Sequence, residues 1–214
     1  ENTTWQRALV IANLQICDTH SGLGEIAAAR QVSQEMISQC EALIESESGI
    51  NHLYLYQSCF SSQGWLEEKA SNWMAAATAY ESAVSVSRKI VSQDAGNETA
   101  NQTLHESLIL LGNSYLELHK MHKAQTCFEE ALALTEAADS SSSWHLSLIQ
   151  SNTLLAKLHL ADRQLDETIH YCTRNIEVIP TLNEELRKSQ ETQYERACVS
   201  GLLVQAYRIR ANQT

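Results

Sequence analysis

Proline and glycine are scarce in this sequence: its 214 residues include one proline and seven glycines. A β-rich fold needs a turn about every 8–12 residues and builds many of its turns from these two residue types, so such a fold is not expected. No run of about 18 apolar residues occurs, and no membrane-spanning helix is expected. Basic residues are also few, because 15 Lys and Arg stand against 26 Asp and Glu. We therefore expect no nucleic-acid partner and no membrane partner.

The abundant residues favour helices. Apolar residues make up 43% of the chain, which is enough for a core, and alanine, leucine, glutamate, glutamine and serine dominate. None of the six cysteines belongs to a Cys-x-x-Cys pair, and their wide spacing indicates reduced thiols used as small apolar residues. Four Asn-x-Thr sequons point weakly to secretion, and we attribute them to chance in a chain rich in Asn and Thr. The sequence thus predicts an all-α, cytoplasmic protein.

Two histidines three residues apart, His119 and His122, are followed by Cys127 and raise the question of a zinc site. Zinc needs three or four convergent ligands, and no fourth ligand is nearby. We expect the histidines at a surface turn and the cysteine beside a core ring. The sequence also has no GxSxG, HExxH, Walker or EF-hand pattern. We therefore predict a protein that is not an enzyme, with no catalytic residue, no metal site and no cofactor.

Other groups with chemical potential have simpler explanations. The carboxylate pairs at 67–68 and 129–130 are expected to be ordinary surface charge. His20 and His159 are expected to place a ring with a polar edge at a helix end. A catalytic role would require a partner carboxylate or nucleophile, and the pattern supplies none.

Small and aromatic residues recur at fixed intervals. The clearest copy reads L111-G112-x-x-Y115 and then A124-x-x-x-F128-x-x-A131. It predicts two antiparallel helices joined by a turn near 119–120. The helices would approach closely at the small residues, while the rings fill the space between them.

The same pattern repeats along the whole chain. The equivalent small residues are Cys17, Gly64, Gly112, Ala156 and Val204, at steps of 47, 48, 44 and 48 residues. In the second helix of the unit, the corresponding positions are Ala76, Tyr80 and Ala83 in the second copy, and Thr168, Cys172 and Asn175 in the fourth. Such near-constant steps indicate an array of helical hairpins.

This array resembles the tetratricopeptide repeat. That family places Leu-Gly and Tyr in the first helix, then Ala, an aromatic and Ala in the second, with a closing proline that Pro180 supplies once. The family's unit is about 34 residues, so the present repeats are extended, as in the arrays of bacterial signalling and regulatory proteins. The N-terminal segment WQRALVIANLQICD is similar to a sequence motif that is common in such arrays. The resemblance implies a right-handed α-α superhelix, with about four hairpins and a final helix.

We expect a single repeat domain over 1–214, with repeats at 3–48, 50–94, 99–139 and 143–180 and a final helix at 181–211. Connections are expected at 47–49, 93–99 and 139–143, which are rich in Ser, Gly or Asn. The last helix is expected to begin with a capping box, in which Thr181 caps and Glu184 reaches back.

In the resembling family, the first helices line a concave groove that binds extended peptides or a partner helix. The residue one and four positions after each small residue should face this groove. The predicted groove residues are Asp18, Trp65, Glu68, Asn113, Leu116, Lys157, Leu160, Gln205 and Arg208. Trp65 is the favoured anchor, since its ring buries a large area, although packing between hairpins is nearly as good an explanation.

The resemblance also bears on the choice of partner. Chaperone-binding members hold a C-terminal carboxylate with a lysine–asparagine clamp, and the lysine position before Asn113 is Ile109 here. Its equivalents are Leu14 and Ser61, so no chaperone C-terminal tail is expected to bind. A slightly acidic groove suits a neutral or basic peptide, or another segment of the same polypeptide.

The sequence leaves three functions open. The first is a protein–protein interaction scaffold in a larger regulatory protein, an expectation that also rests on a chain that opens at Glu1 without a methionine. The second is a ligand-responsive sensor that controls an attached effector. The third is an oligomerisation or stalk element that associates through an uncapped end.

Overall fold

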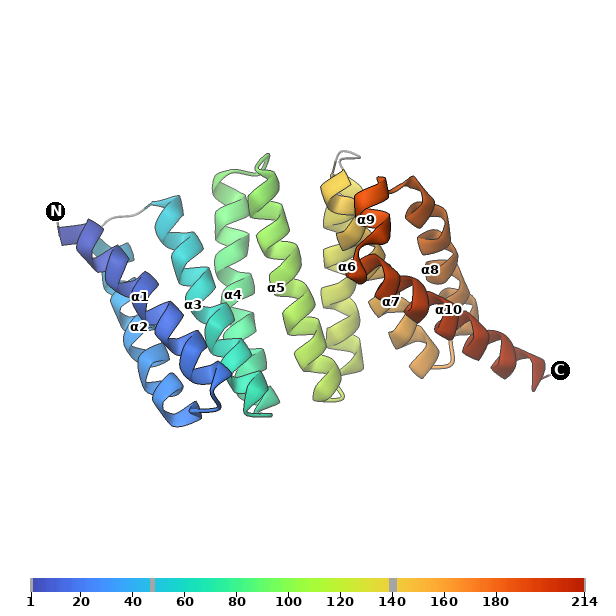
Figure 1. Cartoon of the computed structure of the whole chain (residues 1–214), viewed down its shortest axis with the longest axis horizontal. Helices are drawn as coiled ribbons and strands as arrows, with labels where there is room; N and C mark the ends of the chain where they lie inside the picture. The colour runs from blue at the N-terminus through green and yellow to red at the C-terminus, as the bar shows by residue number, and fades with distance from the viewer. Residues whose placement is uncertain (1, 47–48, 139–141, 214) are drawn as a thin grey trace. The chain divides into compact units, whose positions relative to one another are not determined.

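The chain is all-α over the part described by the computed structural model, residues 2–46, 49–138 and 142–213 (Figure 1). Its helices are α1 (Asn2–Gly22), α2 (Ile26–Ser46), α3 (Ile50–Lys69), α4 (Trp73–Gln93), α5 (Glu98–Glu117), α6 (Met121–Ala137), α7 (Ser142–Ala161), α8 (Leu165–Val178), the 3₁₀ turn η1 (Ile179–Thr181), α9 (Glu184–Lys188) and α10 (Gln190–Ala211). The internal contacts form two compact units, Glu1–Lys120 (unit 1) and Met121–Thr214 (unit 2). The all-α prediction is confirmed, whereas the assignment of 1–214 to a single repeat domain stays a prediction.

The same left-handed turn follows each of the helices α1, α3, α5 and α7. Gly24 has a φ of 78°, and Ser71, His119 and Arg163 have φ values of 56°, 56° and 59°. These residues are 47, 48 and 44 positions apart, which are the steps predicted from the small residues. After each one, the next backbone N–H donates to the carbonyl five residues earlier, at 2.8–2.9 Å. This bond satisfies a carbonyl that the helix end would otherwise leave unpaired.

Three of these turns place a side chain where glycine is preferred, and this gives a testable prediction. Ser71→Gly should raise the free energy of unfolding by about 1 kcal/mol, because a Cβ is disfavoured in the left-handed region. Gly24→Ala should lower it by a similar amount, since nothing lies within 4 Å of the added Cβ and only the backbone is affected. Urea denaturation of both variants checks the pair. If both variants have the same free energy of unfolding as the wild type, the two turns do not share the left-handed conformation.

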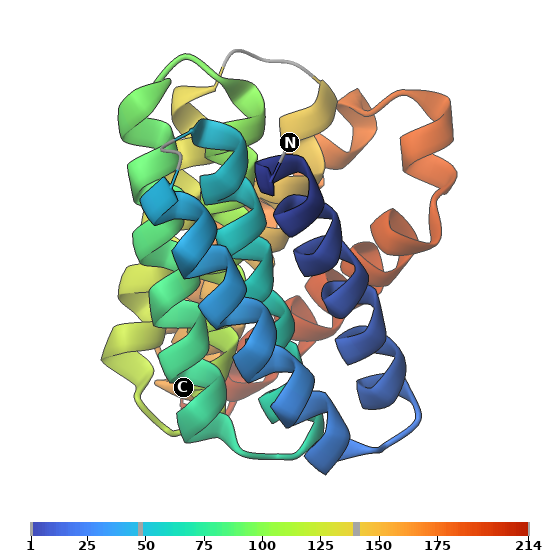
Figure 2. The same ribbon diagram turned by 90° about the vertical axis from the view of Figure 1, so that its left-hand side faces the viewer.

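Small residues bring the helices of unit 1 together, as predicted. Cys17 of α1 packs with Ala29 of α2 and Leu66 of α3 in one buried cluster. An ideal Cβ on Gly64 of α3 would lie 2.4 Å from the ring of Tyr80 on α4, so only glycine fits there. In Figure 2 the structure is turned so that the side with α1 and α2 faces the viewer.

Glu67 is not the surface carboxylate that the sequence suggested. It is only 6% exposed, and Arg30 of α2 donates to both of its carboxylate oxygens at 2.7 Å. Asn72, in the turn after α3, donates to the same carboxylate at 2.9 Å. Arg30 is the main cause that holds the pKa of Glu67 below its usual range. In the second copy, the position that corresponds to His20 and His159 thus holds a buried carboxylate paired with the exposed Arg30.

Unit 2 is built around α7, α8 and α10. Ala156 and Cys172 are both fully buried and pack with Val199 and Leu202 of α10, and Leu160 packs against the same cluster. Ala156 therefore packs with Cys172, which stands at the position of the ring residues Tyr80 and Phe128 in the second and third copies.

The final segment differs from the single helix predicted at 181–211. Leu182 has an extended backbone and is 2% exposed in a cluster with Ile149 and Ile179, and this burial interrupts the helix. Thr181 does not cap a helix, because its hydroxyl donates back to the carbonyl of Val178 at 2.7 Å. Asn183 caps α9, where its side chain accepts from the N–H of Leu186 at 2.9 Å.

The register of α10 also differs. Val204, predicted to be the small residue of a fifth copy, is 58% exposed, and Ala206 is the buried small residue instead. The predicted connection at 93–99 is found between α4 and α5. Those at 47–49 and 139–143 include residues 47–48 and 139–141, which lie outside the described residues.

Candidate functional site

A groove in unit 1 is lined by the first helices of three successive predicted repeats. Its volume is about 450 Å³, and α1, α3 and α5 supply its walls. The lining residues are Leu14, Asp18, Gln57, Ser58, Ser61, Ser62, Trp65, Glu106, Ser107 and Leu110. The second helices α2 and α4 contribute no residue to it. The groove is therefore a product of the repeat, because equivalent faces of the three helices turn to one side.

The groove combines apolar and acidic surface. Leu14, Trp65 and Leu110 offer apolar area on all three helices. Among the described residues, no lysine or arginine lines it, although Lys69 places its ammonium 5.2 Å from the centre of the Trp65 ring. This ammonium group already provides a cation–π contact to the indole, so Trp65 offers a ligand mainly apolar surface.

Two carboxylates face the groove from opposite helices. Asp18 of α1 accepts a hydrogen bond from Ser62 of α3 at 2.6 Å, which fixes its position. Glu106 of α5 is exposed, and partial burial of its carboxyl raises its pKa. A cation that enters the groove would stabilise the charged form of Glu106 and compensate this desolvation.

Hydroxyl and amide groups hold the floor in place. Gln57 of α3 donates to Ser107 of α5 at 3.0 Å and to Ser61 at 2.9 Å. Ser87 of α4 lies 3.1 Å from the same Ser107 hydroxyl. This chain of bonds ties α3, α4 and α5 together beneath the groove, so its floor is preorganised for a ligand.

Of the predicted groove residues in unit 1, Asp18 and Trp65 line the groove. Glu68 instead accepts a hydrogen bond from the Tyr80 hydroxyl at 3.0 Å. Asn113 is exposed and Leu116 is half-buried on α5, and neither belongs to the lining.

In unit 2 the predicted residues lie in different surroundings. Lys157 places its ammonium 5.8 Å from the Tyr194 ring, and Leu160 packs into the core of the unit. Gln205 and Arg208 are exposed on α10.

The predicted set does not include the lining residues nearer the helix N-termini. Ser58 and Glu106 lie six residues before the small residues Gly64 and Gly112, and Leu14 lies three before Cys17. The prediction used positions one and four residues after the small residue. The lining residues of α3 and α5 lie near the middle of these 20-residue helices, whereas the predicted positions lie nearer their C-terminal ends. Extending the same i, i+4, i+7 face backwards by two turns would have found these residues.

The three residues considered for a zinc site lie at separate places in the structure. His119 forms the turn after α5, His122 is exposed at the start of α6, and Cys127 is buried in unit 2. All six cysteines are free thiols. No group of three or more His, Cys, Asp or Glu suited to a metal occurs among the described residues. None of the helices described is long and apolar enough to cross a bilayer.

Comparisons with known proteins support the fold. No family model matches the chain, and no curated protein matches it. Among solved structures, it is similar to the crystal structure of BtubC (BKLC) from P. vanneervenii, with a TM-score of 0.68 and 17% sequence identity. The match covers 97% of this chain and 82% of that one. At this identity the likeness establishes a shared all-helical fold.

Proposed function

We propose that the chain is a protein-interaction module of the tetratricopeptide type, which binds a peptide segment in the groove of unit 1. The observation that carries the proposal is the groove itself, lined by the equivalent helices of three successive repeats and floored by a hydrogen-bonded network. Its volume of about 450 Å³ suits a few side chains of an extended peptide. The turns repeated at 47, 48 and 44 residues support the extended repeat on which the proposal rests.

The chemistry of the lining defines the ligand. Asp18 and Glu106 favour a basic side chain, while Trp65 and Leu110 favour an aliphatic or aromatic neighbour. Within the part of the chain that the structure describes, no cationic residue lines the groove to hold a free carboxylate, and Leu14 and Ser61 stand where the chaperone-binding clamp has lysine. The proposed partner is therefore a peptide with Arg or Lys beside an apolar residue, from another protein or another segment of the same polypeptide.

Selection from a displayed library of random peptides, with the whole chain as target, tests this proposal. We expect enrichment of peptides that carry Arg or Lys next to an apolar residue. Ser61→Arg should abolish binding of the enriched peptides, because it places a cation and extra volume in the groove. Ser85→Arg on the exposed face of α4 is the matched control and should bind as the wild type does.

The variants also separate the groove from other surfaces. Circular dichroism should show that both arginine variants retain the helical content of the wild type. If Ser61→Arg is folded and still binds the enriched peptides with unchanged affinity, the groove is not the binding site and the proposal is wrong. Enrichment of acidic peptides would contradict the proposed ligand class.

A further inference from the structure

Helix α1 carries an apolar stripe on the side away from the groove. Trp5 is 77% exposed, Leu9 42%, Ile16 44% and Leu23 69%, and the small Ala12 lies between them. Leu23 follows the helix but continues its spiral, because its N–H donates to the carbonyl of Thr19 at 3.0 Å. Exposed apolar residues are normal singly, whereas a continuous row along one helix marks an interaction surface.

The stripe has the spacing of a coiled-coil seam. Its positions are 5, 9, 12, 16, 19 and 23, with alternating steps of four and three residues over three heptads. The flanking positions hold no Lys, Arg, Asp or Glu: they are Gln6, Ala8, Asn13, Gln15, His20 and Gly22. The charged residues within α1, Arg7 and Asp18, lie at neither the seam nor its flanks. Although the chain carries a net charge of −11, two copies of this face would not repel each other locally.

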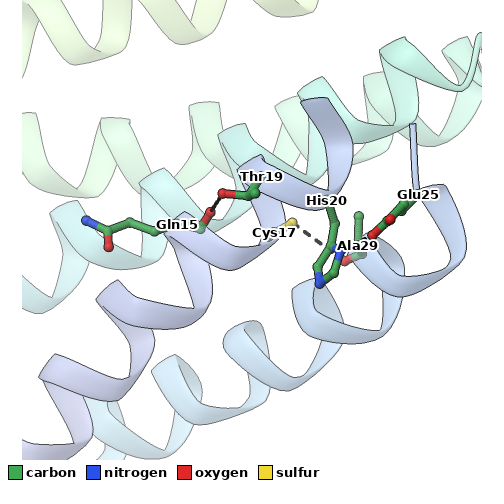
Figure 3. Close-up of polar contacts among 6 residues, drawn as sticks. All are labelled: Gln15, Cys17, Thr19, His20, Glu25 and Ala29. Carbon is green, nitrogen blue, oxygen red and sulfur yellow. Dashed lines mark hydrogen bonds and ion pairs between the residues drawn. The ribbon is translucent and has the colours of Figure 1, made fainter. Parts of the chain in front are cut away.

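The polar residue within the seam is already satisfied. Figure 3 shows the Thr19 hydroxyl donating to the carbonyl of Gln15, at 2.7 Å. The same view shows His20 directed at Glu25 beyond the helix end, 2.5 Å from Nδ1 to Oε2. A helix that packs on the seam would therefore bury Thr19 without leaving its hydroxyl unpaired. A shallow hollow between Ala12, Ile16 and Thr19 leaves room for a facing side chain.

The next hairpin shows what this face does when it is covered. In α3, the residues 47 positions after Leu9 and Ala12 are Tyr56 and Cys59. Cys59 is fully buried against Cys40 of α2, and Tyr56 donates to Glu41 of α2 at 2.8 Å. This face of the first helix is thus a helix-packing face of the repeat. In α1, none of the residues that the structure describes covers this face.

We infer that this stripe pairs two copies of the chain through an antiparallel contact between their α1 helices. The spacing reads the same in both directions, so a two-fold axis near residue 14 sets Trp5 against Leu23 of the second copy and Ala12 against its Ile16. The small Ala12 opposite the large Ile16 permits close approach at the centre. Asp18 and Leu14 lie on another side of α1, so the contact leaves the groove of unit 1 accessible. This inference does not depend on the proposed peptide binding.

Sedimentation equilibrium over a wide concentration range tests the contact. The wild type should show a reversible monomer–dimer equilibrium. Ala12→Glu should weaken the dimer by at least about tenfold, because it places a carboxylate in the seam of each copy. Ala27→Glu adds the same charge at an exposed position of α2 and should dimerise as the wild type does.

Mixing variants tests the antiparallel register. The Ile16→Lys variant should dimerise as weakly as the Ala12→Glu variant. A mixture of the two should form heterodimers, because an antiparallel pair places the glutamate at position 12 of one copy beside the lysine at position 16 of the other. A parallel pair would place position 12 beside position 12 and would not give these heterodimers. A wild type that stays monomeric at millimolar concentration, including one whose stripe binds a helix of another protein, would overturn the inference. So would an Ala12→Glu variant that dimerises normally.

Discussion

Replacing Gly64 with alanine should lower the free energy of unfolding by about 3 kcal/mol, at the upper end of typical overpacking costs. The added Cβ would lie 2.4–2.6 Å from three atoms of the Tyr80 ring. Tyr80 is fully buried, and its hydroxyl is held by Glu68, so the ring cannot simply move aside. The loss should appear as a lower urea midpoint with an unchanged slope.

Two further variants show that the loss comes from this one contact. Gly201 lies in α10, where an added Cβ meets nothing within 4 Å, and Gly201→Ala should raise the stability by about 0.5–1 kcal/mol through helix propensity. In a Tyr80→Leu background, Gly64→Ala should cost much less than in the wild type. An equal cost in both backgrounds would mean that the ring is not what requires glycine at position 64.

Asn175→Ala should also lower the free energy of unfolding by about 3 kcal/mol, because it removes a set of buried hydrogen bonds and leaves a small cavity. Asn175 is fully buried in α8 and donates to the carbonyl of Ile149 and the hydroxyl of Thr153, both at 3.0 Å. It also accepts from the side-chain amide of Asn152 at 2.9 Å. Without Asn175, the buried amide of Asn152 loses this acceptor. Thermal or urea unfolding measures the change.

This prediction opposes the one that the repeat pattern alone would give. The equivalents of Asn175 in the second and third copies are Ala83 and Ala131, so the pattern suggests that alanine is the better residue. The third-copy equivalent of Asn152 is Leu108. The double variant Asn152→Leu with Asn175→Ala should therefore recover most of the lost stability. If Asn175→Ala alone is as stable as the wild type, the buried hydrogen bonds contribute little.

The repeat could be predicted from the sequence because packing at close helix contacts leaves a strong trace. Gly64 and Tyr80 meet as the spacing required, and the turns at Gly24 and Ser71 keep the same interval. The positive φ of the later turns could not be predicted, because these turns have no glycine in the sequence. Three of the turns have a positive φ at a residue other than glycine, namely Ser71, His119 and Arg163. There the backbone hydrogen bond at the helix end outweighs the cost of a positive φ for a residue with a Cβ.

The parts that the sequence did not predict depend on contacts distant along the chain. Glu67 is a buried ion-pair partner only because Arg30, 37 residues earlier, lies beside it. The final helix is interrupted because Leu182 finds a buried position beside Ile149. For the groove, the sequence identified Asp18 and Trp65 but not Glu106, because the position of a groove along long helices is set by how they pack.

The most direct test of the proposed function is an NMR titration of the chain with a library-selected basic peptide, observing the indole N–H signals. The four tryptophans are Trp5, Trp65, Trp73 and Trp144, and Trp65 alone among them lines the groove. We predict that the Trp65 signal shifts in proportion to the bound fraction, while those of Trp5 and Trp73 stay in place. Saturation of binding with an unmoved Trp65 signal, or with a shift confined to Trp5 or Trp73, would contradict peptide binding in the groove of unit 1.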